Sequence, residues 1–225
     1  MNTIELFAGS CEISEYIKRK WHKTFAIDYI DFGKIDKVLN IYNLSLIDIP
    51  YIPDFWWASP DCTTYSIAAC STHRNKDKTA KSDYAKVCDE WNKHWINIML
   101  HFLQKNKNMK VVIENPSWNF KHMDFIKNLK NYWFKCYTVW YCQYWDTRAK
   151  PTNIFTNITN WIPRKKCHNY KYDENWNIID RHCHHESARR WSKTWTQWLK
   201  NSYERSKIPK QLYEEIFNCL KTFDK

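Results

Sequence analysis

The sequence predicts an α/β fold with a mostly parallel sheet, helices on both faces and a small basic subdomain. Two observations predict it. Short apolar runs alternate with longer segments of helical spacing over the first 150 residues, which is typical of parallel sheets. From Pro151 onward, short apolar pieces mix with clustered His, Arg, Lys and Cys. We therefore divide the chain into a main α/β domain 1–150, a smaller basic region 151–204 and a C-terminal segment 205–225 that contains a helix.

Each expected element follows from its local pattern. Strands are expected where short apolar runs meet turn or polar residues, at Thr3–Phe7, Thr24–Ile27, Asp54–Ala58, Met109–Ile113 and Cys136–Tyr141. Helices are expected where apolar spacing is helical over a longer segment, at Glu12–Lys20, Ser82–Gln104, Phe120–Leu129 and Lys207–Leu220. Pro209 fits the last helix because proline is tolerated in a first turn.

Composition and charge narrow the class of protein. The hydrophobic fraction of 44% is enough for a core, and the net charge of +11 favours a polyanionic partner such as nucleic acid. There is no run of 18 apolar residues, so no transmembrane helix and no membrane partner are expected. The start of the chain lacks a secretion pattern, and its nine scattered cysteines contain no CxxC pair. We therefore expect reduced thiols and a cytoplasmic location.

Chemistry-bearing residues fall at the predicted carboxyl ends of strands, where such sheets bind ligands. Gly9 lets the backbone approach a nucleotide-like cofactor, and Asp28 is placed to accept hydrogen bonds from ribose hydroxyls. Cys62 follows a strand and could act as a nucleophile, although an isolated cysteine is more often a buried structural residue. Glu114 could exchange protons beside it, or could be an ordinary solvated carboxylate.

In this order the motifs resemble the cytosine-C5 DNA methyltransferase family, in the short form of phage-type members. The resemblance rests on a set that runs along nearly the whole chain: Leu6-Phe7-Ala8-Gly9-Ser10, Pro60 and Cys62 with Tyr65-Ser66, Glu114-Asn115, Tyr141-Cys142-Gln143-Tyr144 with Arg148, Lys150 to Phe155, and Arg205 to Pro209. It implies a Rossmann-like fold that uses S-adenosylmethionine, in a bacterial or phage-infected cell. It also implies a catalytic and cofactor-binding domain in 1–150, a small basic DNA-recognition region in 151–204 and a C-terminal helix in 205–225 that returns to the catalytic domain.

The resemblance also implies roles for individual residues. Cys62 would add to C6 of a flipped cytosine, Glu114 would supply a proton to the ring, and Arg148 would stabilise the covalent adduct. The expected cofactor-binding residues are Phe7, Ala8, Gly9, Ser10, Asp28, Asp48 and Pro60. Ser66 and Asn115 would contact nucleic acid. Two positions depart from the family pattern, because Asp61 replaces a proline and Cys11 replaces a glycine. A carboxylate beside Cys62 would disfavour the thiolate.

The tryptophan and glycine counts are abnormal. The chain has 2 Gly and 14 Trp, whereas about 16 Gly are expected at this length. By resemblance, glycine is usual at Trp57, Trp145, Trp191, Trp195 and Trp198, and Trp21 and Trp176 lie in turn-like contexts. One hypothesis is that UGA codons read as glycine in the source genome are written here as tryptophan. The alternative is a genuine Trp-rich surface that stacks on bases.

The basic region is expected to read the target sequence. Arg164, Lys165, Arg189 and Arg190 would contact phosphates. No metal site is expected, although Cys167, Cys183, His184 and His185 are zinc candidates whose spacing matches no standard finger.

The leading interpretation is a monomeric DNA cytosine-5 methyltransferase that acts on double-stranded DNA, and a restriction endonuclease is a candidate partner. The alternatives are an inactive DNA-binding relic of such an enzyme and, less favoured, an RNA cytosine methyltransferase on the same fold.

Overall fold

A computed structural model describes residues 1–67, 70–167, 171–175, 177–180, 204 and 207–220. The chain divides into two compact units, Met1–Cys136 with Asn153–Ile158, and Tyr137–Thr152 with Thr159–Lys225. These units divide the chain at points other than the expected boundaries at 150 and 204. No helix among the described residues is long and apolar enough to span a membrane.

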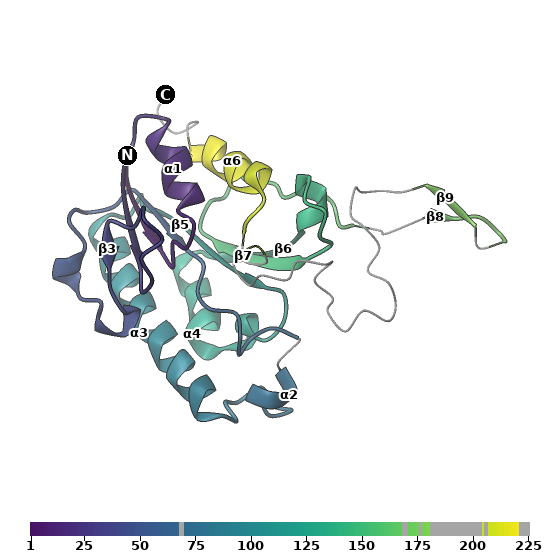
Figure 1. Ribbon diagram of the computed structural model, residues 1–225, viewed down its shortest axis with the longest axis horizontal. Helices are drawn as coiled ribbons and strands as arrows, with labels where there is room; N and C mark the ends of the chain where they lie inside the picture. The colour runs from purple at the N-terminus through teal and green to yellow at the C-terminus, as the bar shows by residue number, and fades with distance from the viewer. Residues whose placement is uncertain (68–69, 168–170, 176, 181–203, 205–206, 221–225) are drawn as a thin grey trace. The chain divides into compact units, whose positions relative to one another are not determined.

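A seven-stranded sheet in the order β3-β2-β1-β4-β5-β7-β6 forms the centre of the fold (Figure 1). Its strands are β1 Asn2–Leu6, β2 Lys23–Asp28, β3 Lys37–Val38, β4 Phe55–Ala58, β5 Lys110–Pro116, β6 Lys135–Trp140 and β7 Pro151–Thr156. The pairs β1–β2, β1–β4, β2–β3 and β4–β5 are parallel. The predicted α/β class is confirmed, and the strand order reverses between β1 and β4. A reversal of this kind marks the usual ligand site of an open α/β sheet.

Helices of the first unit cover both faces of the sheet. They are α1 Glu12–Lys18, α2 Cys70–His73, α3 Asp83–Lys105 and α4 Asp124–Lys127, with 3-10 helices η1 Ile41–Asn43, η2 Leu46–Asp48, η3 Phe120–His122 and η4 Asn128–Tyr132. Ile4 and Leu6 of β1 pack in one core cluster with Trp95 of α3. Glu5 lies between them in sequence and accepts the backbone N–H of Ser14 in α1 at 2.8 Å. Because side chains alternate along a strand, α1 and α3 lie on opposite faces.

One expected helix is not continuous. Phe120–Leu129 was predicted as a single helix, but Met123 has extended backbone with φ −70° and ψ 139°. The chain is therefore divided there into η3, α4 and η4. Their apolar side chains still share the core, because Phe120, Ile126 and Leu129 are all buried in the same cluster.

The second unit contains the remaining elements. These are η5 Tyr141–Tyr144, the antiparallel pair β8 Lys171–Tyr172 and β9 Ile178–Asp180, and α6 Lys210–Asn218. The predicted C-terminal helix is present, and Pro209 is its N-cap residue. The backbone N–H of Leu212 donates to the carbonyl of Pro209 at 3.0 Å.

Three tryptophans adopt the left-handed backbone conformation that favours glycine. Among the described residues, six other than glycine have positive φ, and Trp21, Trp133 and Trp145 are three of them, with φ of 63°, 65° and 64°. The N–H of Trp133 donates to the carbonyl of Lys130 at 3.1 Å, and the next N–H donates to Leu129 at 3.4 Å. This bond pair is the Schellman motif, whose left-handed position is usually glycine. Trp133 did not stand out in the sequence, because its turn carries no other signal.

Trp57 behaves differently from these three. It is 1% exposed within β4, its indole N–H donates to the hydroxyl of Ser59 at 2.9 Å, and its ring packs edge-on against Phe55. The glycine interpretation of Trp57 therefore has no structural support, because this is the environment of a core tryptophan. The further candidates lie outside the described residues: Trp176, Trp191, Trp195 and Trp198.

Burial of Glu5 makes the stability of the fold depend on pH. Burial raises the pKa of Glu5 from 4.5 to about 7, against the opposing effect of its hydrogen bonds with Ser14. The native state thus binds this proton more tightly than the unfolded chain does. The contribution of Glu5 to the free energy of unfolding is fully present below pH 4.5, and it is lost as the pH rises through about 7.

We expect Glu5→Gln to be more stable than the wild type by about 3 kcal/mol at pH 8. The amide oxygen can still accept the Ser14 N–H but carries no charge. At pH 4.5 the two proteins should differ little. Urea unfolding at both pH values measures this, and an equal difference at the two values would contradict it.

Candidate active site at the carboxyl edge of the sheet

The loop after β1 has strained and open backbone. Phe7, Gly9 and Cys11 have φ of 57°, 49° and 55°. Left-handed backbone is costly for residues other than glycine and tends to occur at functional sites. No other atom lies within 4 Å of the position that a Cβ would take at Gly9. A ligand could therefore approach this backbone closely, as expected for the predicted cofactor loop of Phe7, Ala8, Gly9 and Ser10.

Cys11 fits its position despite its departure from glycine. Its side chain is fully buried, and its thiol donates to the carbonyl of Lys34 at 3.5 Å. Burial raises the pKa of Cys11 to about 12, so the group stays a neutral thiol at physiological pH. The substitution therefore fills a buried position and adds no charge to the loop.

Asp28 closes the cofactor loop onto the end of β2. Its Oδ2 accepts the N–H of Gly9 at 2.9 Å, and its Oδ1 accepts the N–H of Ile30 at 3.1 Å. Each carboxylate oxygen can accept a second hydrogen bond, so contact with ribose hydroxyls stays a prediction. The structure adds a role that the sequence did not indicate, which is to shape the loop itself.

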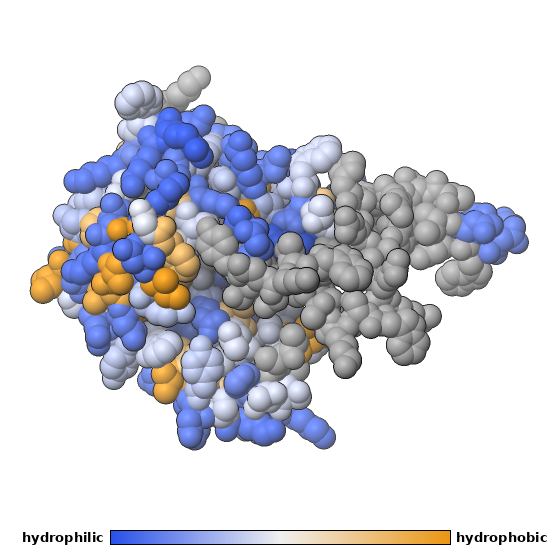
Figure 2. All heavy atoms as spheres, viewed as in Figure 1, coloured by the Kyte–Doolittle hydropathy of each residue, from blue (hydrophilic) through white to orange (hydrophobic). Residues whose placement is uncertain are grey.

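Asp48 is engaged in local contacts. Its Oδ1 accepts from Lys37 at 2.5 Å, and its Oδ2 accepts both the N–H and the hydroxyl of Ser45 at 2.7 Å. These bonds, with that of Lys37 first, hold the pKa of Asp48 below its usual range. The expected contact of Asp48 with the cofactor would have to share these oxygens. Apolar side chains gather on the face of the molecule that carries β3 (Figure 2), and the exposed ones include Ile30, Val38 and Ile47.

The segments that carry Cys62 and Glu114 leave the same edge of the sheet. Ala58 of β4 pairs with Ile113 of β5, so Glu114 is the next residue along β5 and Ser59 the next after β4. The side-chain amide of Asn115 donates to the carbonyl of Pro60 at 3.0 Å and so joins the two segments. Glu114 is 5% exposed. The predicted nucleophile and proton donor therefore lie on adjacent segments beside the strand reversal.

Asn115 has a positioning role in this structure. It is 0% exposed, and its Oδ1 has no hydrogen-bond partner within the described part of the chain. A direct contact of Asn115 with nucleic acid stays a prediction. The observed contact is the internal bond to Pro60, which fixes where the Cys62 segment begins.

A tight turn holds Cys62 in the segment Pro60–Ser66, which we call the catalytic segment. The carbonyl of Cys62 accepts the N–H groups of Tyr65 at 3.0 Å and Ser66 at 2.9 Å. Cys62 and Ser66 are half-buried. Moving Tyr65 would therefore move Cys62, because the turn links their backbones.

Asp61 stabilises this turn through its carboxylate. Its Oδ1 accepts the N–H of Thr63 at 2.9 Å and the hydroxyl of Thr63 at 2.7 Å, and its Oδ2 accepts the hydroxyl of Tyr84 in α3 at 2.6 Å. The carboxylate is thus satisfied by three donors. Asp61, which stands where the family pattern has a proline, therefore has a structural function, because it binds the catalytic segment to α3.

Arg148 belongs to the second unit and is described there. It is 7% exposed, pairs with Asp146, and donates to the carbonyls of Glu204 and Lys207 at 3.3 and 2.8 Å. Its guanidinium also lies over the ring of Tyr141 at 5.3 Å. These contacts fix its orientation, and its predicted support of the adduct stays a prediction.

The basic residues of the recognition region divide into described and undescribed ones. Arg164 is paired with Glu215 of α6, and its guanidinium lies over the ring of Tyr144 at 5.0 Å. Its expected phosphate contact stays a prediction. Lys165 is exposed. Arg189 and Arg190 lie outside the described residues, as do the zinc candidates Cys183, His184 and His185.

Cys167, the remaining zinc candidate, is buried in a small apolar cluster with Cys142. Within the described ranges, no group of three or more His, Cys, Asp or Glu side chains could hold a metal ion.

Comparison with solved structures identifies the fold. The methyltransferase EhMeth of Entamoeba histolytica superposes with a TM-score of 0.52 at 18% identity, over 79% of this chain and 61% of that one. The chain shares the fold of that methyltransferase. Two other structures are similar at lower scores. They are the Dnmt2 methyltransferase of S. pombe (TM-score 0.45, 14% identity, 69% and 48% covered) and a DNMT2 mutant from Spodoptera frugiperda (0.46, 18%, 73% and 52%).

The chain spans less than two thirds of the length of each of those three proteins. No protein-family model matches the sequence, and no curated protein matches it. At these identities the likeness concerns the fold, and the site residues rest on the geometry described above.

Proposed function

We propose that the chain is a DNA cytosine-5 methyltransferase that uses S-adenosylmethionine. One observation carries the proposal. A cysteine segment and a Glu-Asn segment follow the paired strands β4 and β5, and the amide of Asn115 joins them beside the open loop of Gly9. A nucleophile, a proton donor and a cofactor loop at one strand reversal are the groups this reaction needs.

The residues near Gly9 fit the cofactor. The loop offers exposed backbone where a Cβ would find open space, and Asp28 retains lone pairs for hydroxyl groups. Ile30, two residues after Asp28, has an exposed apolar side chain that would suit an aromatic ring. When bound, S-adenosylmethionine supplies an electrophilic methyl group.

The two side chains would divide the chemistry between them. Cys62 Sγ forms a bond to C6 of the flipped cytosine, and the C5–C6 electron pair becomes available as Glu114 gives a proton to ring N3. C5 would then take the methyl group as the bond between that group and the sulfonium sulfur breaks. Loss of the C5 proton to water, with return of the N3 proton to Glu114, would restore the C5–C6 double bond, break the sulfur–carbon bond and free Cys62 as a thiolate. The target atom lies inside duplex DNA, so the base must leave the stack.

A basic cavity next to the catalytic segment supports a polyanionic substrate. It has a volume of about 240 Å3, and its lining contains no acidic side chain: Ser71, Arg74, Asn75, Lys76, Lys78, Trp118 and Asn119. The backbone N–H of Asn119 donates to the carbonyl of Tyr65 at 3.0 Å, which places the cavity beside this segment. Lysines in such a groove attract phosphates.

Duplex DNA containing 5-fluorocytosine tests the proposal. Fluorine cannot leave C5 as a proton does, so a covalent protein–DNA complex should persist when S-adenosylmethionine is present. The complex should disappear in Cys62→Ser and remain in Cys136→Ser, which changes an exposed cysteine.

Failure of the wild type to form this complex would contradict the proposal. Salt-dependent DNA binding without cofactor affinity would then indicate a relic. Faster methylation of structured RNA than of duplex DNA would indicate an RNA enzyme.

A further inference from the structure

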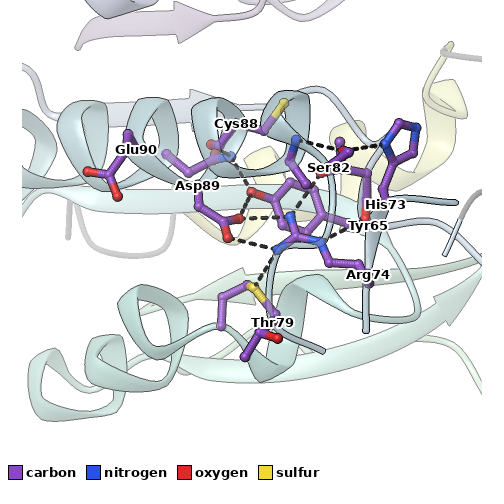
Figure 3. Close-up of polar contacts among 12 residues, drawn as sticks. Tyr65, His73, Arg74, Thr79, Ser82, Cys88, Asp89 and Glu90 are labelled. Carbon is purple, nitrogen blue, oxygen red and sulfur yellow. Dashed lines mark hydrogen bonds and ion pairs between the residues drawn. The ribbon is translucent and has the colours of Figure 1, made fainter. Parts of the chain in front are cut away.

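An ion pair between the buried Arg74 and the partly buried Asp89 lies next to the catalytic segment (Figure 3). Arg74 follows α2, and its side chain is 1% exposed, while Asp89 lies on α3. Nη1 and Nη2 of Arg74 donate to the two carboxylate oxygens of Asp89 at 2.7 and 2.8 Å. The pair is therefore bidentate, which is the most geometrically specific form of this interaction.

The remaining donors of Arg74 reach the catalytic segment. Nε donates to the carbonyl of Thr64 at 3.1 Å, and Nη2 donates to the hydroxyl of Thr64 at 2.9 Å. The last N–H reaches the sulfur of Met123 at 3.6 Å. A guanidinium has five N–H groups, so each one has a partner. Two of these five N–H groups hold Thr64, which is two residues after Cys62.

Tyr65 joins the same network. Its hydroxyl donates to Asp89 Oδ1 at 2.6 Å and accepts from the side-chain amide of Asn92 at 3.0 Å. The guanidinium of Arg74 lies 4.4 Å from the centre of its ring. The turn bond from Tyr65 N–H to the Cys62 carbonyl carries this constraint to the nucleophile.

The geometry points to Arg74 and Asp89 as positioning residues that fix the catalytic segment, and thereby Cys62, against α3. This inference rests on the proposed function for its effect on chemistry. Attack on C6 requires the sulfur within a narrow range of positions, and a displacement of about 1 Å can cost about 100-fold in rate. A buried ion pair is a poor source of stability but a good source of defined geometry.

Tyr65→Phe is the sharpest test, because it removes one hydroxyl and leaves the Arg74–Asp89 pair intact. Its matched control is Tyr51→Phe, which removes a hydroxyl bond to the carbonyl of Thr3 at 2.8 Å, away from the segment. We expect kcat and the rate of covalent trapping to fall about tenfold in Tyr65→Phe alone, with KM for cofactor unchanged and similar melting temperatures in both variants.

A second variant removes both charges together. The double variant Arg74→Met with Asp89→Leu leaves no isolated buried charge. Proteins tolerate the loss of both partners of a buried ion pair better than the loss of one. We expect this double variant to fold and to lose more activity than Tyr65→Phe. The single variant Arg74→Lys should not reach the wild-type rate, because an ammonium group cannot reproduce the bidentate contact and the two bonds to Thr64.

Hydrogen exchange of the amides of residues 63–66 separates this inference from the proposed function. We expect exchange to speed up about tenfold in Tyr65→Phe and in the double variant, but not in Tyr51→Phe. Exchange equal to that of the control would overturn the inference whether or not the enzyme methylates DNA. Faster exchange with unchanged kcat would also overturn it. A wild type that neither traps nor methylates would overturn the proposed function, while exchange would still decide whether Arg74 holds the segment.

Discussion

Glu114→Gln is expected to slow methyl transfer by about a thousandfold. The amide has nearly the shape of the carboxyl and can still hydrogen-bond to a cytosine ring, but it has no acidic proton to give as sulfur adds to C6. Because Glu114 is 5% exposed and lies within the buried run of β5, a shape-preserving change is needed to leave the fold intact. Single-turnover methylation with saturating cofactor measures the effect directly.

Glu90→Gln provides the control for this substitution. Glu90 is exposed on α3 and pairs only loosely with Lys93, since both side chains are at least half exposed. Its replacement should leave the single-turnover rate unchanged. If Glu114→Gln kept a rate within threefold of the wild type, another group would have to supply the proton, and the proposed mechanism would fail.

Replacing Trp21, Trp133 and Trp145 with glycine should stabilise the protein by about 1 kcal/mol at each site. A bulky residue in left-handed backbone is strained, and glycine relieves that strain at some cost in the entropy of the unfolded chain. The three side chains are 96%, 84% and 61% exposed, so little packing is lost. Urea unfolding of each single variant measures the gain.

Trp95→Gly should show the opposite effect. Trp95 is 0% exposed, and its indole donates to Asn92 at 2.9 Å, so its removal should destabilise the protein by about 3 to 5 kcal/mol. The UGA hypothesis requires that replacement by glycine raise the free energy of unfolding at the strained, exposed tryptophans and lower it at a core tryptophan such as Trp95. The coding DNA and the mass of the natural protein decide it, and UGG codons at Trp21, Trp133 and Trp145 would contradict it.

The sequence predicted the sheet better than it predicted the contacts around the site. Strands such as Phe55–Ala58 and Lys110–Pro116 are buried runs with clear ends, so their pattern alone located them. The two-residue strand β3 was missed because it is too short for a pattern. Pro151 to Phe155 were assigned to the basic region 151–204, yet Pro151–Thr156 forms β7 in the main sheet.

The site residues divide in the same way. Gly9, Cys62 and Glu114 stand next to strand ends, where local sequence signals their position. Arg74 and Asp89 are 15 residues apart and lie in no motif, so only the folded chain brings them together. The bond between Asp61 and Tyr84 could not be predicted either, because Asp61 lies in a loop and Tyr84 lies 23 residues later, on α3.

The alignment of β4 with β5 limits where this chain can change length. An extra residue in the connection Asn106–Met109, ahead of β5, would leave the partner of Ala58 unchanged. An extra residue between Ile113 and Glu114 would turn the carboxyl group to the opposite side of the sheet, because side chains alternate along a strand. Natural variants of this protein should therefore gain and lose residues on the amino side of these strands and keep a fixed spacing beyond them.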